Sequence, residues 1–188
     1  CCEAAAELIL SQTEKIQLIC LDPANETAPD DETSSFLSFR DQLITIAQNR
    51  SLSLKERMEQ LLQAVSFPLP GCDFLPLYRS LEQLDSAWDH LLSSLPSLSF
   101  VPLPSCSSHL ETPMEQFLVY LLFRHVAAAF EDEDIAGHTA FCVLSVCVLI
   151  ALCRSKADCS LADMMNFARM YSSEIEYSDE NKDLVLGK

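Results

Sequence analysis

Thr139-Ala-Phe-Cys-Val-Leu-Ser-Val-Cys-Val-Leu-Ile-Ala-Leu-Cys153 is the stretch that decides the fold of this chain. It carries no charged side chain, and the basic residues Arg154 and Lys156 that follow it suit the C-terminal end of a helix. A membrane-spanning helix needs about 20 apolar residues, and this stretch is shorter. It therefore predicts a helix buried in a protein core, and we do not expect the chain to bind a membrane.

The segments on either side also carry signals for helix starts. In Thr112-Pro-Met-Glu115 the threonine hydroxyl and the glutamate can satisfy free backbone N–H groups reciprocally, which predicts a capped helix. The acidic run from Glu131 to Asp134 suits the N-terminus of the buried helix. Ser160-Leu-Ala-Asp163 predicts the start of a last helix that passes through Tyr171 to Tyr177.

The first half of the chain shows helical periodicity as well. Apolar spacing predicts helices over residues 4–19 and 35–48. Ser53-Leu-Lys-Glu56 is another capping box, and Asp73 can cap a further helix. That last helix is predicted from apolar residues that recur at alternating spacings of 4 and 3, namely Leu77, Leu81, Leu84, Trp88, Leu91 and Leu95.

The composition agrees with an all-α fold. The chain contains only 3 glycines and no Asn-Gly or Asp-Gly pair, which argues against β-hairpins. We expect an irregular helical bundle of about six or seven helices, packed as one compact domain. Within it we distinguish an N-terminal part (1–95), a Pro- and Ser-rich connector (96–112) and a C-terminal part (113–188) that holds the buried helix 139–153.

The formal net charge of −16 restricts the possible partners. An acidic surface repels phosphate, so nucleic-acid binding is not expected. A basic partner or a lysine-bearing protein surface is attracted more easily. No secretory signal begins the chain, so the 9 cysteines are expected to be reduced thiols in a cytoplasmic protein.

Two groups of residues are candidate metal ligands. The chain starts on Cys1-Cys2 without an initiator Met, so we expect a fragment of a longer protein. These cysteines are either frayed ends, or one of them ligates a metal or iron–sulfur cluster completed by upstream residues. His138 and Cys142 lie four residues apart and could share a metal, but core packing is favoured because a structural zinc site takes four ligands.

Other candidate chemistry is weaker. The acidic run from Glu131 to Asp134 lacks the alternating ligands and the glycine of a calcium loop. Glu174 and Glu176 point to different helix faces, so they do not predict an acid–base pair. No glycine-rich phosphate loop is present. Four cysteines in or near loops carry no catalytic-thiol signature: Cys20, Cys72, Cys106 and Cys159.

The order of segments resembles the flagellin lysine-N-methylase family over nearly the whole chain. Cys2 (or Cys1), followed by an apolar helix, is similar to the last cysteine of that family's cysteine-rich region. The segment from Glu115 to Arg124 is similar to the family's acidic-aromatic-leucine segment that ends in Phe-Arg. The segment from Met170 to Tyr177 resembles its terminal signature.

This chain departs from the family pattern at two positions. The family often has arginine where Ser173 stands and histidine where Tyr177 stands. If either side chain shapes a substrate or cofactor site in the family, that site is changed here.

The resemblance implies methyl transfer from S-adenosylmethionine to lysine ε-amines of flagellin. It also implies an iron–sulfur cluster on the family's cysteines, with Cys2 or Cys1 as one ligand, and a fragment that is inactive alone. The substrate-docking candidates are Glu115, Tyr171, Glu174 and Glu176. The alternatives are a non-catalytic module that binds a peptide or helix, and a small-molecule sensor with an apolar pocket between its central helices.

Overall fold

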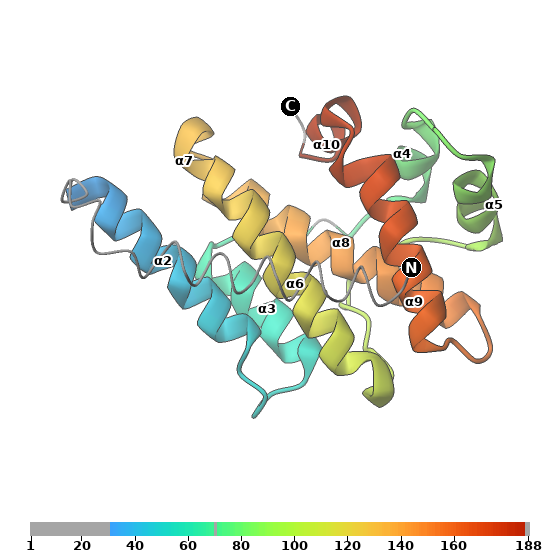
Figure 1. Ribbon diagram of the computed structural model, residues 1–188, viewed down its shortest axis with the longest axis horizontal. Helices are drawn as coiled ribbons and strands as arrows, with labels where there is room; N and C mark the ends of the chain where they lie inside the picture. Colours follow the sequence, from blue (N-terminus) through green and yellow to red (C-terminus); the bar gives the residue numbers. More distant parts are fainter. Residues whose placement is uncertain (1–30, 70, 187–188) are drawn as a thin grey trace. The chain divides into compact units, whose positions relative to one another are not determined.

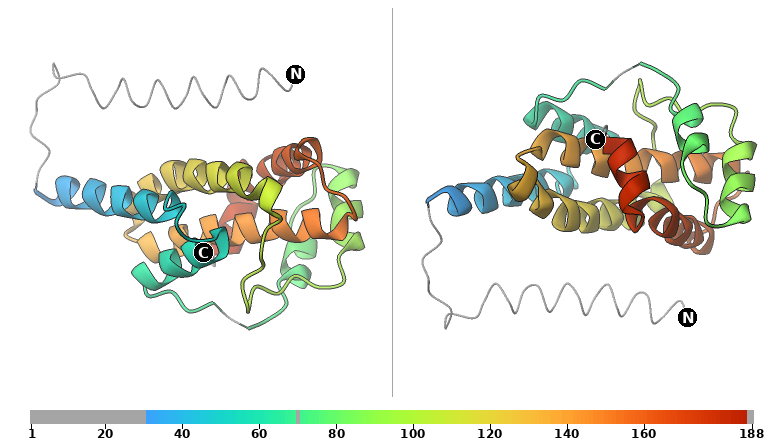
Figure 2. Two further views of the ribbon diagram at one scale, coloured as in Figure 1. Left: turned by 90° about the horizontal axis from the view of Figure 1, so that it is seen from below. Right: turned by 90° about the horizontal axis from the view of Figure 1, so that it is seen from above.

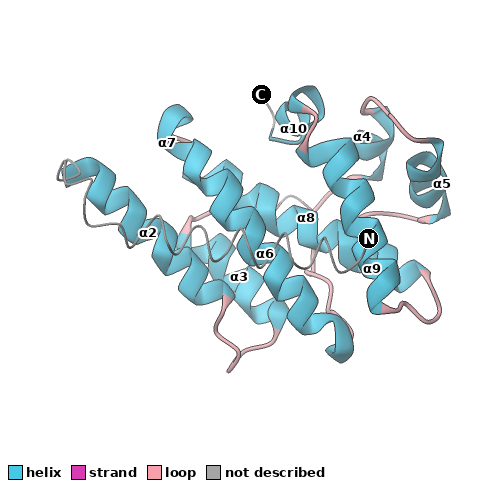
Figure 3. Cartoon of the chain, viewed as in Figure 1, coloured by secondary structure: helices cyan, strands magenta, loops and turns pink. Residues whose placement is uncertain are grey.

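The computed structural model describes residues 31–69 and 71–186, and within these it is all-α, as predicted (Figures 1 and 3). The chain divides into two units, Cys1–Ser35 and Phe36–Lys188, and the second holds the core described below. The helix expected over residues 4–19 lies outside the described residues. The α-helices are α2 (Asp31–Ala47), α3 (Leu54–Ala64), α4 (Leu75–Ser80), α5 (Ser86–Ser94), α6 (Glu111–His125), α7 (Ala129–Asp132), α8 (Ile135–Ser155), α9 (Leu161–Tyr171) and α10 (Asp179–Leu186).

Helix α8 forms the centre of the second unit. It packs against α6, α9 and α3, and Figure 2 shows it lying between α3 and α6. With its ends included, α8 is long and apolar enough to cross a membrane, but 78% of its most apolar window is buried inside the protein. Burial, rather than length, thus distinguishes it as a core helix, and the predicted burial of residues 139–153 is confirmed except at the half-buried Ala151.

Local capping signals start most of the long helices. The capping boxes at Ser53 and Ser160 both form, and Asp134 caps α8 by accepting the Gly137 N–H at 2.8 Å. The box predicted at Thr112 is wrong. A 3₁₀ turn over Ser108–Leu110 leads into α6, so that helix begins at Glu111 without a side-chain cap. The Glu115 carboxylate instead accepts hydrogen bonds from Arg50 and Arg57, which lie between α2 and α3 and in α3. Such charge-assisted bonds are stronger than a bond to a backbone N–H.

The single helix predicted after Asp73 is two helices, α4 and α5. The chain between Leu81 and Asp85 leaves the helical conformation, and Leu84 becomes exposed despite its place in the apolar stripe. Asp85 then caps α5 by accepting the Ala87 N–H at 2.9 Å.

The C-terminal segment also differs in detail from the prediction. Helix α9 ends at Tyr171 and continues as a π-helical turn over Ser172–Glu176. Helix α10 follows and was not predicted. The predicted connector 96–112 is irregular up to the 3₁₀ turn at Ser108–Leu110, and α6 begins within it at Glu111. Several of its apolar side chains lie in the same core as α8: Leu98, Phe100, Leu103 and Leu110.

Candidate functional site

The segments Glu115–Arg124 and Met170–Tyr177 meet at the carboxylate of Glu176. Tyr120 on α6 donates its hydroxyl to Glu176 Oε1 at 2.7 Å, across 56 positions of sequence. Arg124 Nε lies 3.0 Å from the same oxygen. Tyr120 and Arg124 are one helical turn apart on α6, so both side chains reach the π-helical turn. We call Tyr120, Arg124, His125, Glu176 and Tyr177 the Glu176 cluster.

The rest of the cluster joins the buried carboxylate to the surface. Arg124 Nη1 donates to the hydroxyls of Tyr120 at 3.1 Å and Tyr177 at 3.4 Å, and its guanidinium lies 4.5 Å from the centre of the Tyr177 ring. His125 Nε2 lies 3.4 Å from Glu176 Oε1. Glu176 is buried, whereas Tyr177 is 62% exposed. The outer face of the cluster is therefore a tyrosine ring stacked on an arginine.

The electrostatics of the cluster favour a permanent ion pair. Burial by itself would raise the pKa of Glu176, but the neighbouring His125, Ser172 and Tyr120 side chains outweigh it and lower that pKa. Burial likewise opposes the charge of Arg124, yet the neighbouring Tyr120 and Glu176 raise its pKa. Burial and the Glu176 carboxylate raise the pKa of Tyr120. At neutral pH the cluster holds a carboxylate, a guanidinium and a neutral phenol, which suits positioning rather than proton transfer.

The cluster also contains buried polar atoms with unused hydrogen-bonding capacity. Within the described part of the chain, Glu176 Oε2 and His125 Nε2 have no partner with hydrogen-bond geometry. Cys142 lies near Glu176, and burial raises the pKa of its thiol well above the ordinary value. That thiol is therefore protonated and a poor nucleophile.

All four predicted docking residues are buried and bonded inside the protein. Glu115 contacts Arg50 and Arg57, and Glu174 accepts the Leu84 N–H at 2.8 Å. The Tyr171 hydroxyl is 2.8 Å from that of Ser145, which itself donates to a backbone carbonyl. None of the four side chains is exposed in this structure. Their role in docking a substrate stays a prediction, because no observation tests it.

Sequence reasoning missed Tyr120, Arg124 and His125 as site residues. The i, i+4 spacing of Tyr120 and Arg124 within a segment already singled out was the available signal. Nothing in that spacing identified Glu176 as their partner.

The candidate metal ligands are not gathered into a site in the described residues. Cys1 and Cys2 lie outside them. His138 Nε2 lies 2.8 Å from Asp132 Oδ2, and Cys142 is buried in the core, in agreement with the packing interpretation. Between residues 31 and 186, leaving aside residue 70, no group of three or more His, Cys, Asp or Glu side chains is arranged to hold a metal ion.

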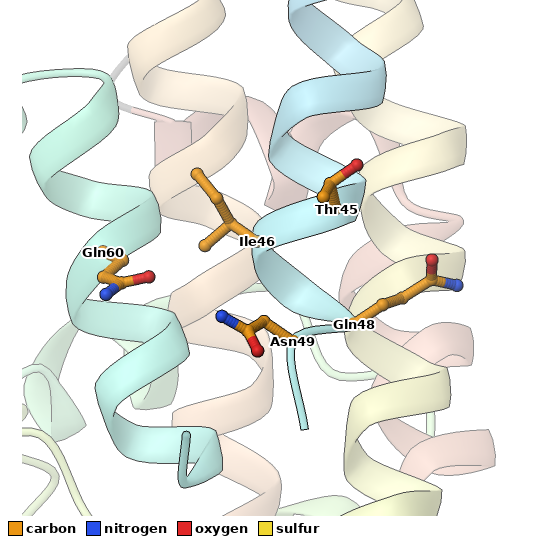
Figure 4. Close-up of a pocket in the computed structure, with 5 residues that line it drawn as sticks. All are labelled: Thr45, Ile46, Gln48, Asn49 and Gln60. Atoms are coloured by element: carbon orange, nitrogen blue, oxygen red, sulfur yellow. The ribbon is translucent and has the colours of Figure 1, made fainter. Parts of the chain in front are cut away.

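An open depression of about 370 Å³ lies between α2 and α3 (Figure 4). Ile46, Asn49 and Gln60 point into the space between the two helices, as Figure 4 shows. Four of its five lining residues have polar side chains: Thr45, Gln48, Asn49 and Gln60, beside Ile46. A small-molecule sensor is expected to have an enclosed and largely apolar pocket, which this depression does not resemble.

Comparisons of the chain with models of known protein families, with curated proteins and with solved structures found no match.

Proposed function

We propose that the chain is the C-terminal helical region of a protein-lysine N-methyltransferase that methylates lysine side chains of flagellin with S-adenosylmethionine. The proposal starts from the sequence resemblance. One structural observation supports it: the two resembling segments, Glu115–Arg124 and Met170–Tyr177, converge on the Glu176 carboxylate.

The proposed role of the Glu176 cluster is to position a surface. The buried ion pair holds α6 against the π-helical turn and sets Arg124 and Tyr177 at the exposed edge. Tyr177 stands where the family often has histidine, so substrate or cofactor contacts at this edge are those expected to differ in this member. Proton transfer within the cluster is not part of the role, because its carboxylate stays ionised and its phenol neutral.

The cofactors are proposed to bind elsewhere in the full-length protein. S-adenosylmethionine supplies the methyl group, and Cys2 (or Cys1) would be one ligand of an iron–sulfur cluster completed by upstream cysteines. A lysine must lose its proton before it accepts a methyl group, and desolvation at the site lowers its pKa.

The test uses the full-length protein purified without oxygen, mixed with flagellin and S-adenosylmethionine, with methylation followed by intact mass. We expect stepwise methyl additions to flagellin. Either Cys1→Ala or Cys2→Ala should abolish them, whichever variant removes the cysteine that ligates the cluster. Glu176→Gln should reduce the rate, since it leaves Arg124 without its buried partner. Glu180→Gln, at an exposed position of α10, is the matched control and should leave the rate unchanged.

Two results would count against the proposal. Absence of methylation by folded, cluster-loaded protein would favour a non-catalytic interaction module. A Glu176→Gln variant with the normal rate would show that convergence of the two segments is unrelated to the activity.

A further inference from the structure

The break between α4 and α5 presents a leucine to solvent beside α10. By its spacing Leu84 belongs to the apolar stripe that continues at Trp88, yet its side chain is 64% exposed. Leu184 on α10 is 52% exposed. Within residues 31–69 and 71–186 these are the two most exposed leucines, and the function proposed above uses neither of them.

Side-chain hydrogen bonds place the two leucine-bearing segments next to each other. Asn181 on α10 accepts the Glu82 N–H at 3.0 Å and donates to the Glu82 carbonyl at 2.8 Å. Leu184 follows Asn181 by three residues, so the two are neighbours on one side of α10. Each leucine therefore lies two or three residues from the contact that joins the break to α10 (Figure 1).

The backbone that carries Leu84 is held in place by buried groups. The Leu84 N–H donates to the carboxylate of Glu174 at 2.8 Å, and Glu174 is 1% exposed. Asn181 also donates to the Glu174 carbonyl at 2.7 Å, so the same buried pair holds both sides of the break. A side chain on a backbone held in this way loses little conformational freedom when a partner covers it.

Carboxylates surround both leucines. Glu82 and Asp85 flank Leu84, and both are exposed. Asp183, also exposed, directly precedes Leu184. We call these five residues the Leu84–Leu184 surface, which combines apolar side chains with a negative potential.

The basic side chains near this surface are already engaged. Between residues 82 and 89 and between residues 179 and 186 the sequence has one lysine, Lys182, and no arginine. The Lys182 ammonium lies 2.7 Å from Asp179 Oδ1. Arg79, three residues before Glu82, donates its Nη2 to the Leu92 carbonyl at 3.2 Å. The negative charge of the surface is thus left for a partner to neutralise.

We propose that the Leu84–Leu184 surface docks a basic amphipathic segment of another protein. That segment places an apolar side chain against the leucines and lysines or arginines against the carboxylates. The inference does not depend on the proposed function, since it requires neither flagellin nor methyl transfer.

Charge distinguishes this partner from other occupants. A second copy of the chain, related by a two-fold axis, would bring the same carboxylates against each other. Nucleic acid and anionic membranes carry negative charge and are repelled as well. The first 30 residues of the chain contain six acidic side chains and one lysine, so they do not complement the surface either.

The test measures binding of a probe peptide to the full chain by fluorescence anisotropy. The probe is a labelled helical peptide of about five turns, with leucines along one face and lysines on both sides of them. Leu84→Ser and Leu184→Ser should each weaken binding by about tenfold, because each removes apolar area that the partner buries. Leu161→Ser is the matched control, since Leu161 is 48% exposed at the start of α9, and it should leave the affinity unchanged.

The charge of the surface is tested separately. The double variant Glu82→Gln/Asp183→Asn should weaken binding by about threefold or more at low salt, and by less at high salt, where these carboxylates are screened. Glu59→Gln changes a surface carboxylate of α3 and should leave the affinity unchanged. A probe with glutamates in place of its lysines should not bind.

Amide hydrogen exchange of the wild-type chain locates the bound probe without any substitution. Protection should appear at residues 82–85 and in α10. The proposal is overturned if the lysine-bearing probe fails to bind, if protection is confined to other helices, or if Leu161→Ser weakens binding as much as Leu84→Ser does. A dimer of the chain alone that Leu84→Ser dissociates in analytical ultracentrifugation would also overturn it, because a second copy would then be the occupant.

Discussion

Glu115 is a buried carboxylate shared by two arginines. Arg57 Nη1 lies 2.6 Å from Glu115 Oε2 and also donates to the Ala47 carbonyl at 2.9 Å. Arg50 donates to the same carboxylate through both its Nε and Nη2 atoms. Since Arg57 is 2% exposed, its charge needs compensation, which Glu115 supplies at 2.6 Å and Glu111 at 3.7 Å. The residue predicted to cap α6 therefore ties that helix to the end of α2 and the start of α3.

Replacing Glu115 should strongly destabilise the protein. Glu115→Gln removes the nearer carboxylate partner of the buried Arg57 and leaves it only Glu111, at 3.7 Å. We expect a loss of about 3 kcal/mol in the free energy of unfolding, measured by urea denaturation. The matched control is Glu59→Gln, because Glu59 forms a surface pair with Lys55. That change should cost about 0.5 kcal/mol or less. Equal losses in the two variants would contradict the buried-pair account.

The same residue should make stability depend on acid pH. Burial opposes the charge of Glu115, but hydrogen bonds from Arg50 and Arg57 outweigh it, so its folded pKa is below the ordinary value of 4.5. Its stabilising contribution is present above that ordinary value and is lost as pH falls through the lower, folded pKa. The stability difference between wild type and Glu115→Gln should therefore shrink between about pH 6 and about pH 3. A constant difference over that range would show that ionisation of Glu115 does not contribute.

At the scale of elements, the break between α4 and α5 is held by the C-terminal segment. Asn181 accepts the Glu82 N–H at 3.0 Å and donates to the Glu82 carbonyl at 2.8 Å. It also donates to the Glu174 carbonyl at 2.7 Å, and the Glu174 carboxylate accepts the Leu84 N–H. These contacts satisfy backbone groups that a continuous helix would have paired internally, so the interruption is stabilised from outside.

Removing Asn181 should loosen this break. Asn181→Ala loses three hydrogen bonds at a buried site, and we expect a destabilisation of about 1–3 kcal/mol. Amide hydrogen exchange at Glu82 should accelerate more than exchange in α8. Asn166→Ala, at an exposed position of α9, serves as the control and should change neither quantity. Unaltered exchange of the Glu82 amide in Asn181→Ala would show that the Asn181 hydrogen bonds do not stabilise the break between α4 and α5.

At the start of α8, the stabilisation by the Asp134 cap can be compared with the helix propensity of the residue at position 137. A Cβ atom added at Gly137 would collide with the Asp134 carboxylate that caps the helix. In wild type, Gly137→Ala should therefore be neutral or destabilising, because the lost cap is worth about 1 kcal/mol. In an Asp134→Ala background the same change should stabilise by up to about 1 kcal/mol, since alanine favours helix over glycine. Melting temperatures of the four proteins measure this difference, and identical effects of Gly137→Ala in both backgrounds would contradict it.

At the scale of the whole molecule, an apolar central helix is combined with a strongly acidic composition. Helix α8 supplies much of the core, while the net charge of −16 belongs to the chain as a whole. Such a molecule attracts basic surfaces electrostatically. Dissolved salt limits the range of this attraction to the Debye length, which is about 10 Å at moderate ionic strength.

The proposed function, combined with this net charge, predicts that association with flagellin weakens as salt is added. We expect the on-rate measured by surface plasmon resonance to fall by about fivefold or more between low and physiological ionic strength, because steering of cationic lysines is screened. An on-rate independent of salt would remove electrostatic steering from the proposed function. It would leave the methylation experiment as a separate test.

The sequence by itself determined the local and periodic features of this protein. The all-α class, the buried helix around 139–153 and the capping boxes at Ser53 and Ser160 depend on residues only a few positions apart, whose spacing is visible in the chain. The tertiary structure alone decided the pairing of Glu115 with arginines, the break before α5 and the meeting of Tyr120 with Glu176. Each of those joins groups distant in sequence, and which buried charge or N–H finds which partner is settled only when the helices pack.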